Sequence, residues 1–419
     1  MSQQSGKSKS RFIAILATTI LLLVLVPMIG LFGAMFSGDA AGRWGKVNDV
    51  ILDRIAVTVI LAVTVMVISV LIALPFALAL RRARFFGQNL LRVLYVMPLL
   101  IPAHIQGIAW MRVMGRQGNL TAWLVENFGY ELNVRAGWLE LGGKPIFFPG
   151  AIWMLVAAFW PVAALIISAG LARLDPRAEE AALFVPTANQ GNVSRGSRIW
   201  RAVSRGRWFL FLFDSAHRKS VDGILLPLLK PHIMAGAFFV FIFAAGCYPI
   251  PALLDTPTIM IDIFFIASQV DSAAAGVASA PLVLITVLAL VWISVGSRGD
   301  VFQSRSRPVA NPGSLRPRNR LLGAYAWGLV ALTSFVPLYA LLEKAGGLET
   351  YQSIWKNVHK DINNSFKLAL VGAIVVAIGG TVVALYASRL DRKRGFVVEL
   401  LALLPFAFPA IVVGVAMNE

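Results

Sequence analysis

The sequence predicts an all-α, polytopic membrane protein with about nine transmembrane helices. Of its 419 residues, 58% are hydrophobic and only 14% are charged, and the mean hydropathy is +0.74. A soluble domain cannot bury so much apolar surface. Uncharged runs of about 20 residues match the ~30 Å hydrocarbon core of a bilayer when they are helical. The runs are continuous rather than alternating, which favours helices over the strands of a barrel.

The first predicted span follows a basic segment, as a signal peptide would. Its apolar stretch is longer than the core of a typical signal peptide, and no small-residue cleavage site follows, so we expect a retained helix. The nine predicted spans cover residues 12–34, 55–80, 90–111, 149–171, 232–252, 273–295, 321–342, 366–388 and 396–418.

The basic charge is distributed asymmetrically between the loops. The formal net charge is +17. If the N-terminus is cytosolic, the inner segments hold 26 Lys and Arg and the outer segments hold 8. This excess on one side predicts the orientation of a membrane protein. It also favours anionic membrane lipid, and not nucleic acid, as the partner of the basic residues.

The sequence lacks the residue patterns of an enzyme or a cofactor site. The stretch Gly137–Pro145 has the wrong spacing for a phosphate-binding loop, and Pro145 stands where a hydroxyl would meet magnesium. The four histidines are dispersed, and Cys247 is the single cysteine, so neither a metal-ligand cluster nor an internal disulfide is expected. We therefore predict no cofactor, no metal and no catalytic residues.

Two regions of the chain repeat at an offset of 307 residues. The segment 98–103 (Pro-Leu-Leu-Ile-Pro-Ala) matches 405–410 (Pro-Phe-Ala-Phe-Pro-Ala), and several flanking identities keep the same register. Because six spans restore the orientation, both copies begin on the same side, which makes the repeat parallel. The predicted organisation is a first repeat at 1–295, a basic cytosolic linker at 296–320, and an incomplete second repeat at 321–419 with three spans.

The repeated proline pair marks a candidate substrate path. A proline breaks the helical hydrogen-bond ladder, and broken helices often line the path in transporters. Polar side chains at that depth usually face a bundle interior. A packing kink with hydrogen-bonded side chains is the alternative, and the sequence leaves both readings open. The candidate path residues are Pro98, Pro102, His104, Gln106, Pro405 and Pro409.

A polar loop over 172–231 separates the fourth and fifth spans on the predicted inner side. A short helix with small residues and an acid can dock closely against a partner, and a Leu-Pro pair marks the return to the bilayer. The predicted contact residues are Glu179, Glu180, Ala181, Ala182, Leu226 and Pro227.

The Glu180-Ala181-Ala182 loop, the Leu226–Pro231 exit and the repeated proline spans resemble permease subunits of bacterial ATP-binding-cassette importers. The double-length arrangement is similar to the fused permeases of ferric-iron, thiamine and phosphonate uptake. The segment Gly246–Leu254 resembles the stretch after the fifth span in that subgroup. The resemblance implies a multi-pass protein of the bacterial inner membrane that forms a substrate path.

The resemblance also implies the partners. A cytosolic ATPase dimer would receive the Glu180 segment as a coupling helix in a groove, and ATP hydrolysis would occur on that separate subunit. A periplasmic or extracellular substrate-binding protein would select the substrate, and the resemblance makes iron one expectation.

Two features depart from the family pattern. Glu180 and Pro227 lie 47 positions apart, further than in the family, with a basic and aromatic insert between them. That insert either lies in the lipid headgroup layer or disrupts coupling. The chain also offers one coupling loop where a fused permease offers two. A truncated or split nonfunctional permease and a secondary transporter driven by an ion gradient are therefore alternative hypotheses.

Overall fold

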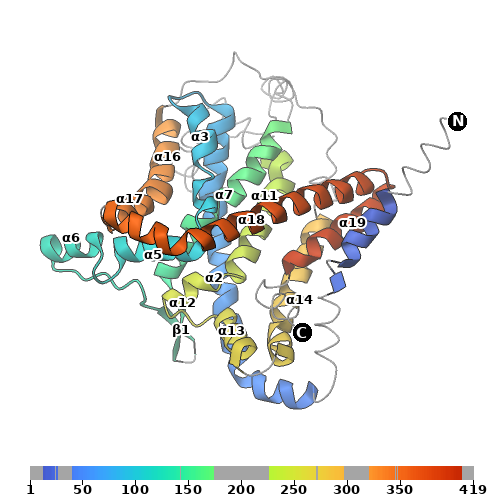
Figure 1. The fold of residues 1–419 in the computed structure, drawn as a ribbon, viewed down its shortest axis with the longest axis horizontal. Helices are drawn as coiled ribbons and strands as arrows, with labels where there is room; N and C mark the ends of the chain where they lie inside the picture. The colour runs from blue at the N-terminus through green and yellow to red at the C-terminus, as the bar shows by residue number, and fades with distance from the viewer. Residues whose placement is uncertain are drawn as a thin grey trace, which may run out of the picture. The chain divides into compact units, whose positions relative to one another are not determined.

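The computed structural model describes residues 13–23, 25–26, 40–141, 143–173, 226–269, 272–296, 320–344, 346 and 348–407 (Figure 1). Within these ranges the chain is almost entirely helical, which confirms the predicted all-α membrane fold. The elements are α2 (Ala40–Arg82), α3 (Gln88–Leu94), α4 (Met97–Leu100), α5 (Ala103–Met114), α6 (Asn119–Phe128), β1 (Trp138–Leu141), β2 (Lys144–Phe147), α7 (Pro149–Arg173), α11 (Leu226–Ala245), α12 (Pro249–Leu253), α13 (Ile259–Gln269), α14 (Ser272–Gly296), α16 (Arg320–Val330), η3 (Ala331–Phe335), α17 (Val336–Lys344), α18 (Leu348–Ala387), α19 (Arg392–Leu403) and η4 (Leu404–Ala407).

Six helical segments in the described part of the chain are long and apolar enough to cross a membrane. A seventh crossing would be the bent pair that runs from Gln88 to Phe128. The six segments are Asp53–Arg82, Pro149–Arg173, Leu228–Ala245, Ala274–Val291, Arg320–Glu343 and Val358–Ala387. Each coincides with a span predicted from hydropathy, because about 20 consecutive apolar residues can satisfy their backbone in lipid only as a helix.

The count of nine spans stays a prediction. The described part of the first predicted span is a shorter apolar helix, Ile13–Leu23. The last predicted span begins within α19 and continues into η4, and its remaining residues lie outside the described ranges.

A small antiparallel hairpin, β1–β2, precedes α7. Trp138 pairs with Phe147 and Leu141 pairs with Lys144 in its register. Gly143, with φ of 76°, occupies the tight turn, where a left-handed backbone suits glycine. The sequence analysis did not predict this hairpin, because four-residue strands leave almost no signal in a hydropathy pattern.

The chain forms two compact units, each assembled from segments distant in sequence. The first contains residues 1–58, 257–294 and 339–419, and the second contains 59–256 and 295–338. These boundaries describe packing, whereas the predicted repeat describes sequence similarity, so the repeat itself stays a prediction.

In the second unit, α7 is the most deeply buried helix and packs along α11. Small residues permit this close approach. A Cβ at Gly236 would lie 3.1 Å from the Cα of Ala163, and a Cβ at Gly170 would lie 2.5 Å from the His232 ring. Small residues at helix contacts let backbones pack tightly where lipid supplies no hydrophobic drive between helices.

The second unit also contains α16, the helix that opens the predicted second repeat. The Tyr325 hydroxyl donates to the Ile72 carbonyl at 2.7 Å, and the Trp160 indole donates to Thr333 Oγ1 at 3.2 Å. Thr333 lies in the π-helical turn η3, which ends two residues before Pro337. Two hydrogen bonds between segments more than 170 residues apart thus fix α16 against α2 and η3 against α7.

In the first unit, the helix Ile13–Leu23 packs against the end of α18 and the start of α19. Ala17, Val383, Ala387 and Val398 form its buried apolar cluster. The first helix of each predicted copy therefore packs with later helices of the other copy. The same unit also includes α13 and α14 from the first copy.

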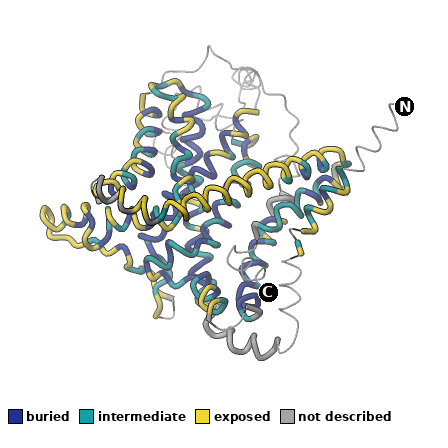
Figure 2. The backbone as a smooth tube through the Cα atoms, in the orientation of Figure 1, coloured by how far each residue is buried: buried dark blue, intermediate teal, exposed yellow. Residues whose placement is uncertain are grey.

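The helix α18 is exposed along most of its length (Figure 2). Its apolar side chains include Phe366 and Leu368, which are 67% and 75% exposed. Such a surface would be unfavourable in water but is the normal surface of a helix in lipid hydrocarbon. This exposure agrees with the assignment of Val358–Ala387 as a membrane span.

Candidate functional site

The proline pair Pro98 and Pro102 lies at a sharp break in a candidate membrane-spanning segment. The legs Gln88–Leu100 and Ala103–Phe128 meet at 97°. At the break, Ile101 is extended (φ −91°, ψ 120°), and Pro102 (φ −52°, ψ 141°) stands directly before α5. The structure therefore shows a broken span, which is a larger change of direction than an ordinary proline kink.

Gln106 repairs the hydrogen bonding at this break. Pro102 has no N–H, so in a continuous helix the Pro98 carbonyl would lose its donor. The side-chain Nε2 of Gln106 donates to that carbonyl at 2.6 Å, while its backbone N–H donates to the Pro102 carbonyl at 3.1 Å. Gln106 is fully buried. Since an unpaired buried carbonyl costs about 1–3 kcal/mol, this amide is a principal stabiliser of the bend.

The oxygen atom of the same side-chain amide makes no hydrogen bond to the described residues. Gln106 Oε1 is buried and has no hydrogen-bond partner among the described residues, and the same holds for the indole Nε1 of Trp110 and Trp153. Trp110 follows Gln106 by one helical turn, and its ring meets that of Trp153 edge-to-face at 5.2 Å. The broken span thus presents one buried acceptor and one buried donor, and α7 adds the second donor at Trp153.

A second short helix, α12, packs against the broken span. A Cβ at Gly107 would lie 3.0 Å from Leu253 Cδ2, so glycine at this position permits the contact. The α12 helix belongs to the segment Gly246–Leu254 that the resemblance singled out. The broken span and the short helix α12 therefore meet beside Gln106.

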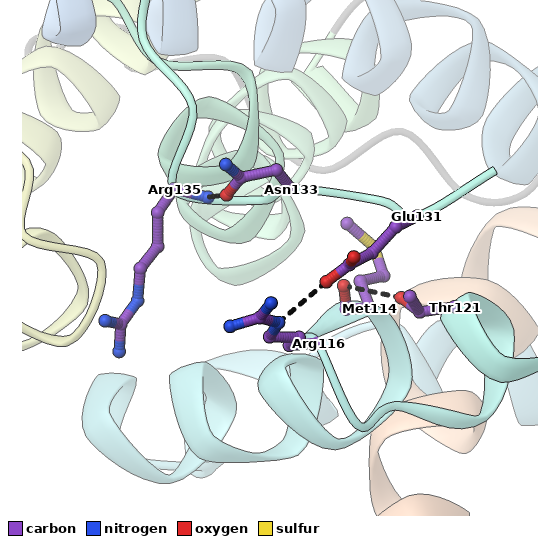
Figure 3. A network of polar contacts seen from close by, with 6 residues as sticks. All are labelled: Met114, Arg116, Thr121, Glu131, Asn133 and Arg135. Carbon is purple, nitrogen blue, oxygen red and sulfur yellow. Dashed lines mark hydrogen bonds and ion pairs between the residues drawn. The ribbon is translucent and has the colours of Figure 1, made fainter. Parts of the chain in front are cut away.

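The loop after α6 is tied to the end of α12 by polar contacts that the sequence analysis missed. Arg135 forms an ion pair with Asp255 at 2.9 Å and donates to the Leu253 carbonyl at 3.4 Å. Figure 3 shows the adjoining contacts, in which Arg116 pairs with Glu131 at 2.7 Å. A single charged residue in a loop carries no sequence signal for a partner more than 100 residues away.

Two further hydrogen bonds fix the backbone from the end of α5 to Arg135 (Figure 3). Thr121 Oγ1 donates to the Met114 carbonyl at 3.1 Å, which satisfies one of the last carbonyls of α5. Asn133 Oδ1 accepts from the backbone N–H of Arg135 at 3.1 Å. The loop therefore presents Arg135 to α12 from an ordered backbone.

The six predicted path residues do not share one environment. Pro98 is buried beside Gln106, whereas Pro102 and His104 are exposed. Pro405 is half-buried in η4, and Pro409 lies outside the described residues. A path lined by all six residues stays a prediction, and the structure brings together only Pro98 and Gln106 through a direct contact.

The predicted coupling residues fall largely outside the described ranges. Glu179, Glu180, Ala181 and Ala182 are all in the part of the chain that the structure does not describe. Leu226 and Pro227 are the first two residues of α11. The coupling role of this loop also stays a prediction. Among the described residues, no group of three His, Cys, Asp or Glu is placed to hold a metal.

Replacing Gln106 with Leu should destabilise the break selectively. The variant keeps the volume but removes the donor to the Pro98 carbonyl, so we expect a loss of about 1–3 kcal/mol in unfolding free energy. The matched control is His104→Leu, an exposed position two residues earlier on the same helix. Thermal unfolding in detergent measures the stability of both variants and of the parent chain. Equal stability of Gln106→Leu and the parent chain would contradict the stabilising role of Gln106.

The comparisons with known proteins place these features in context. No family model matches the sequence. The chain is 23% identical to the putative ferric transport system permease protein FbpB 1 of Haemophilus influenzae, over 96% of this chain and 63% of that protein. It is 23% identical to the ferric transport system permease protein FbpB of Actinobacillus pleuropneumoniae, over 95% of this chain and 56% of that protein.

A shorter relative aligns with part of the chain. The molybdenum transport system permease protein ModB of Mycobacterium bovis is 27% identical over 242 residues, which is 56% of this chain and 75% of that protein. This chain spans about 63% and 56% of the length of the two ferric permeases. The resemblance to transport permeases predicted from the Glu180 loop and the proline pairs is confirmed: along almost its whole length, the chain is similar to two ferric transport system permease proteins.

Proposed function

We propose that this chain is a transmembrane permease component of an ATP-binding-cassette importer. It forms the substrate path and contains no catalytic centre of its own, while a separate cytosolic ATPase dimer hydrolyses ATP. The observation that carries the proposal is similarity to ferric permeases over 95–96% of the chain. The six long apolar helices supply the membrane-embedded body that such a component requires.

The packing of α7 and α11 supports a coupling role for the loop between them. The loop leaves α7 after Arg173 and returns at Leu226, the first residue of α11. Since these two helices contact each other through glycines, they can move as one rigid body. A push on Glu180 and its neighbours, delivered by closure of the ATPase dimer, then reaches the interior of the second unit as a rigid-body movement.

The broken span α3–α6 and the helix α12 form the substrate path in this proposal. The polar atoms of Gln106, Trp110 and Trp153 that lack partners among the described residues would contact water or a substrate oxygen as the path opens. Alternating access would change the contacts of α12 with α5 at Gly107 and with the loop after α6 at Arg135. An external substrate-binding protein would deliver the substrate to the outer end of this path.

Ferric iron is the substrate that we propose to test first. The names of two relatives specify ferric transport, and that of a third specifies molybdenum. In such systems the external binding protein does most of the selecting, so the permease itself carries few marks of its substrate. Membrane lipid surrounds the helices in this proposal, and no nucleic acid takes part.

Replacing the coupling residue tests the proposal directly. Glu180→Ala should lower uptake at least about tenfold, because it removes a charged contact of about 1.5–3 kcal/mol. Deletion of 178–183 should also abolish co-purification of the ATPase. Glu126→Ala, an exposed acid on the predicted outer side, is the control. Uptake and ATPase recovery equal to those of the parent chain in both variants would reject the coupling role.

The proposed orientation, with the N-terminus in the cytosol of a bacterial inner-membrane protein, has a separate test. Cys247 is the single cysteine and is buried, so Cys247→Ala gives a background without thiols. In that background we expect Glu126→Cys to react with a membrane-impermeant maleimide on spheroplasts. We expect Ser194→Cys to react only after permeabilisation. The reverse labelling pattern would place the loop 172–231 outside the cell and end the proposal.

A further inference from the structure

An open pocket lies between the end of α2 and the start of α16, both within the second unit. Its volume is about 320 Å³. Its walls include two cationic side chains, three aromatic side chains and a glycine: Arg84, Arg320, Phe85, Phe86, Trp327 and Gly323. Neither the predicted substrate path nor the predicted coupling loop includes any of these residues.

Two glycines determine the walls of this pocket. Gly87 has φ of 72°, and a Cβ there would lie 2.6 Å from Trp327 Cζ2. A Cβ at Gly323 would lie 2.7 Å from the Cβ of Phe85. The Trp327 indole donates to the Phe86 carbonyl at 2.9 Å. The pocket is therefore a defined contact between a turn of the first repeat and the first helix of the second.

The backbone beneath the pocket is also fixed. Gln88 Nε2 donates to the carbonyls of Leu80 at 2.7 Å and Ala83 at 2.8 Å, so it caps the end of α2. Because the last carbonyls of a helix have no partner within the helix, this cap fixes where α2 ends and where the turn with Arg84 begins.

The two guanidinium groups are available for an anion. Arg84 and Arg320 are both exposed, and no carboxylate among the described residues lies within ion-pair distance of either. Guanidinium groups bind phosphate oxygens through paired N–H donors, with a geometry that a lysine cannot reproduce. The chemistry at the mouth of the pocket is therefore that of a phosphate site.

The pocket also lies beside the ends of two candidate membrane spans. One candidate span ends at Arg82 and another begins at Arg320, so the pocket falls where both helices leave the hydrocarbon. Phe86 beside it is 93% exposed, a position that is unfavourable in water and favourable beside acyl chains. Basic pockets between membrane helices bind anionic lipid headgroups.

We propose that this pocket binds the phosphate of an anionic phospholipid, with Arg84 and Arg320 on the headgroup and Phe86 against an acyl chain. Bound lipid links the turn after α2 to α16 and stabilises the docking of the second repeat's first helix. The site is independent of the transported substrate. Only its assignment to the inner leaflet rests on the orientation proposed above.

The test compares lipids that share acyl chains. The full chain, purified in a neutral detergent, is titrated with phosphatidylglycerol or phosphatidylcholine and followed by native mass spectrometry and thermal unfolding. We expect phosphatidylglycerol to bind and to raise the unfolding temperature. We expect the Arg84→Gln/Arg320→Gln variant to bind it at least about tenfold more weakly. The control Lys356→Gln/Lys360→Gln removes the same charge from exposed positions on α18 and should bind like the parent chain.

Two further arms separate the alternatives. Gly87→Val keeps both arginines but places side-chain atoms where Trp327 lies, and it should also weaken phosphatidylglycerol binding, with unchanged circular dichroism confirming the fold. Inorganic phosphate alone should leave the unfolding temperature unchanged. Equal binding of the two lipids, parent-like binding by the double arginine variant, or stabilisation by inorganic phosphate alone would overturn the lipid assignment.

Discussion

A carbonyl released from a helix inside a membrane needs a donor, because no water is present to supply one. The bond from Gln106 to the Pro98 carbonyl meets this need at the bend between the two legs of the broken span. It allows two helical legs to meet at 97° without an unpaired carbonyl at that position. The path proposed here depends on that bend, since a straight helix would not place α5 beside α12.

The helices α7 and α11 connect this bend to the loop that we propose as the contact with the ATPase. Their glycine contacts leave little room for one to slide without the other. The α7 helix also contacts α4, α5 and α12, the segments that form the break and its neighbour. A displacement at the loop between α7 and α11 would therefore reach the Gln106 region through packed side chains, with no flexible linker between them.

Hydropathy predicted the long spans correctly, because the cost of burying charge in lipid acts on every residue of a 20-residue window. It did not predict the 97° break, the β1–β2 hairpin or the ion pair of Arg135 with Asp255. Each depends on a few local dihedral angles or on partners distant in sequence. The proline pair located the candidate site. The residue pattern left open whether Gln106 stabilises the helix or lines a path, since either role requires a buried amide.

Uptake by proteoliposomes tests the central claim most directly. The chain is reconstituted with its candidate ATPase and binding protein, and accumulation of radioactive ferric iron is measured with ATP on the ATPase side and no ion gradient. The account predicts uptake that requires ATP hydrolysis and stops when the ATPase is inactivated. Uptake that continues without ATP and follows an imposed ion gradient would contradict it.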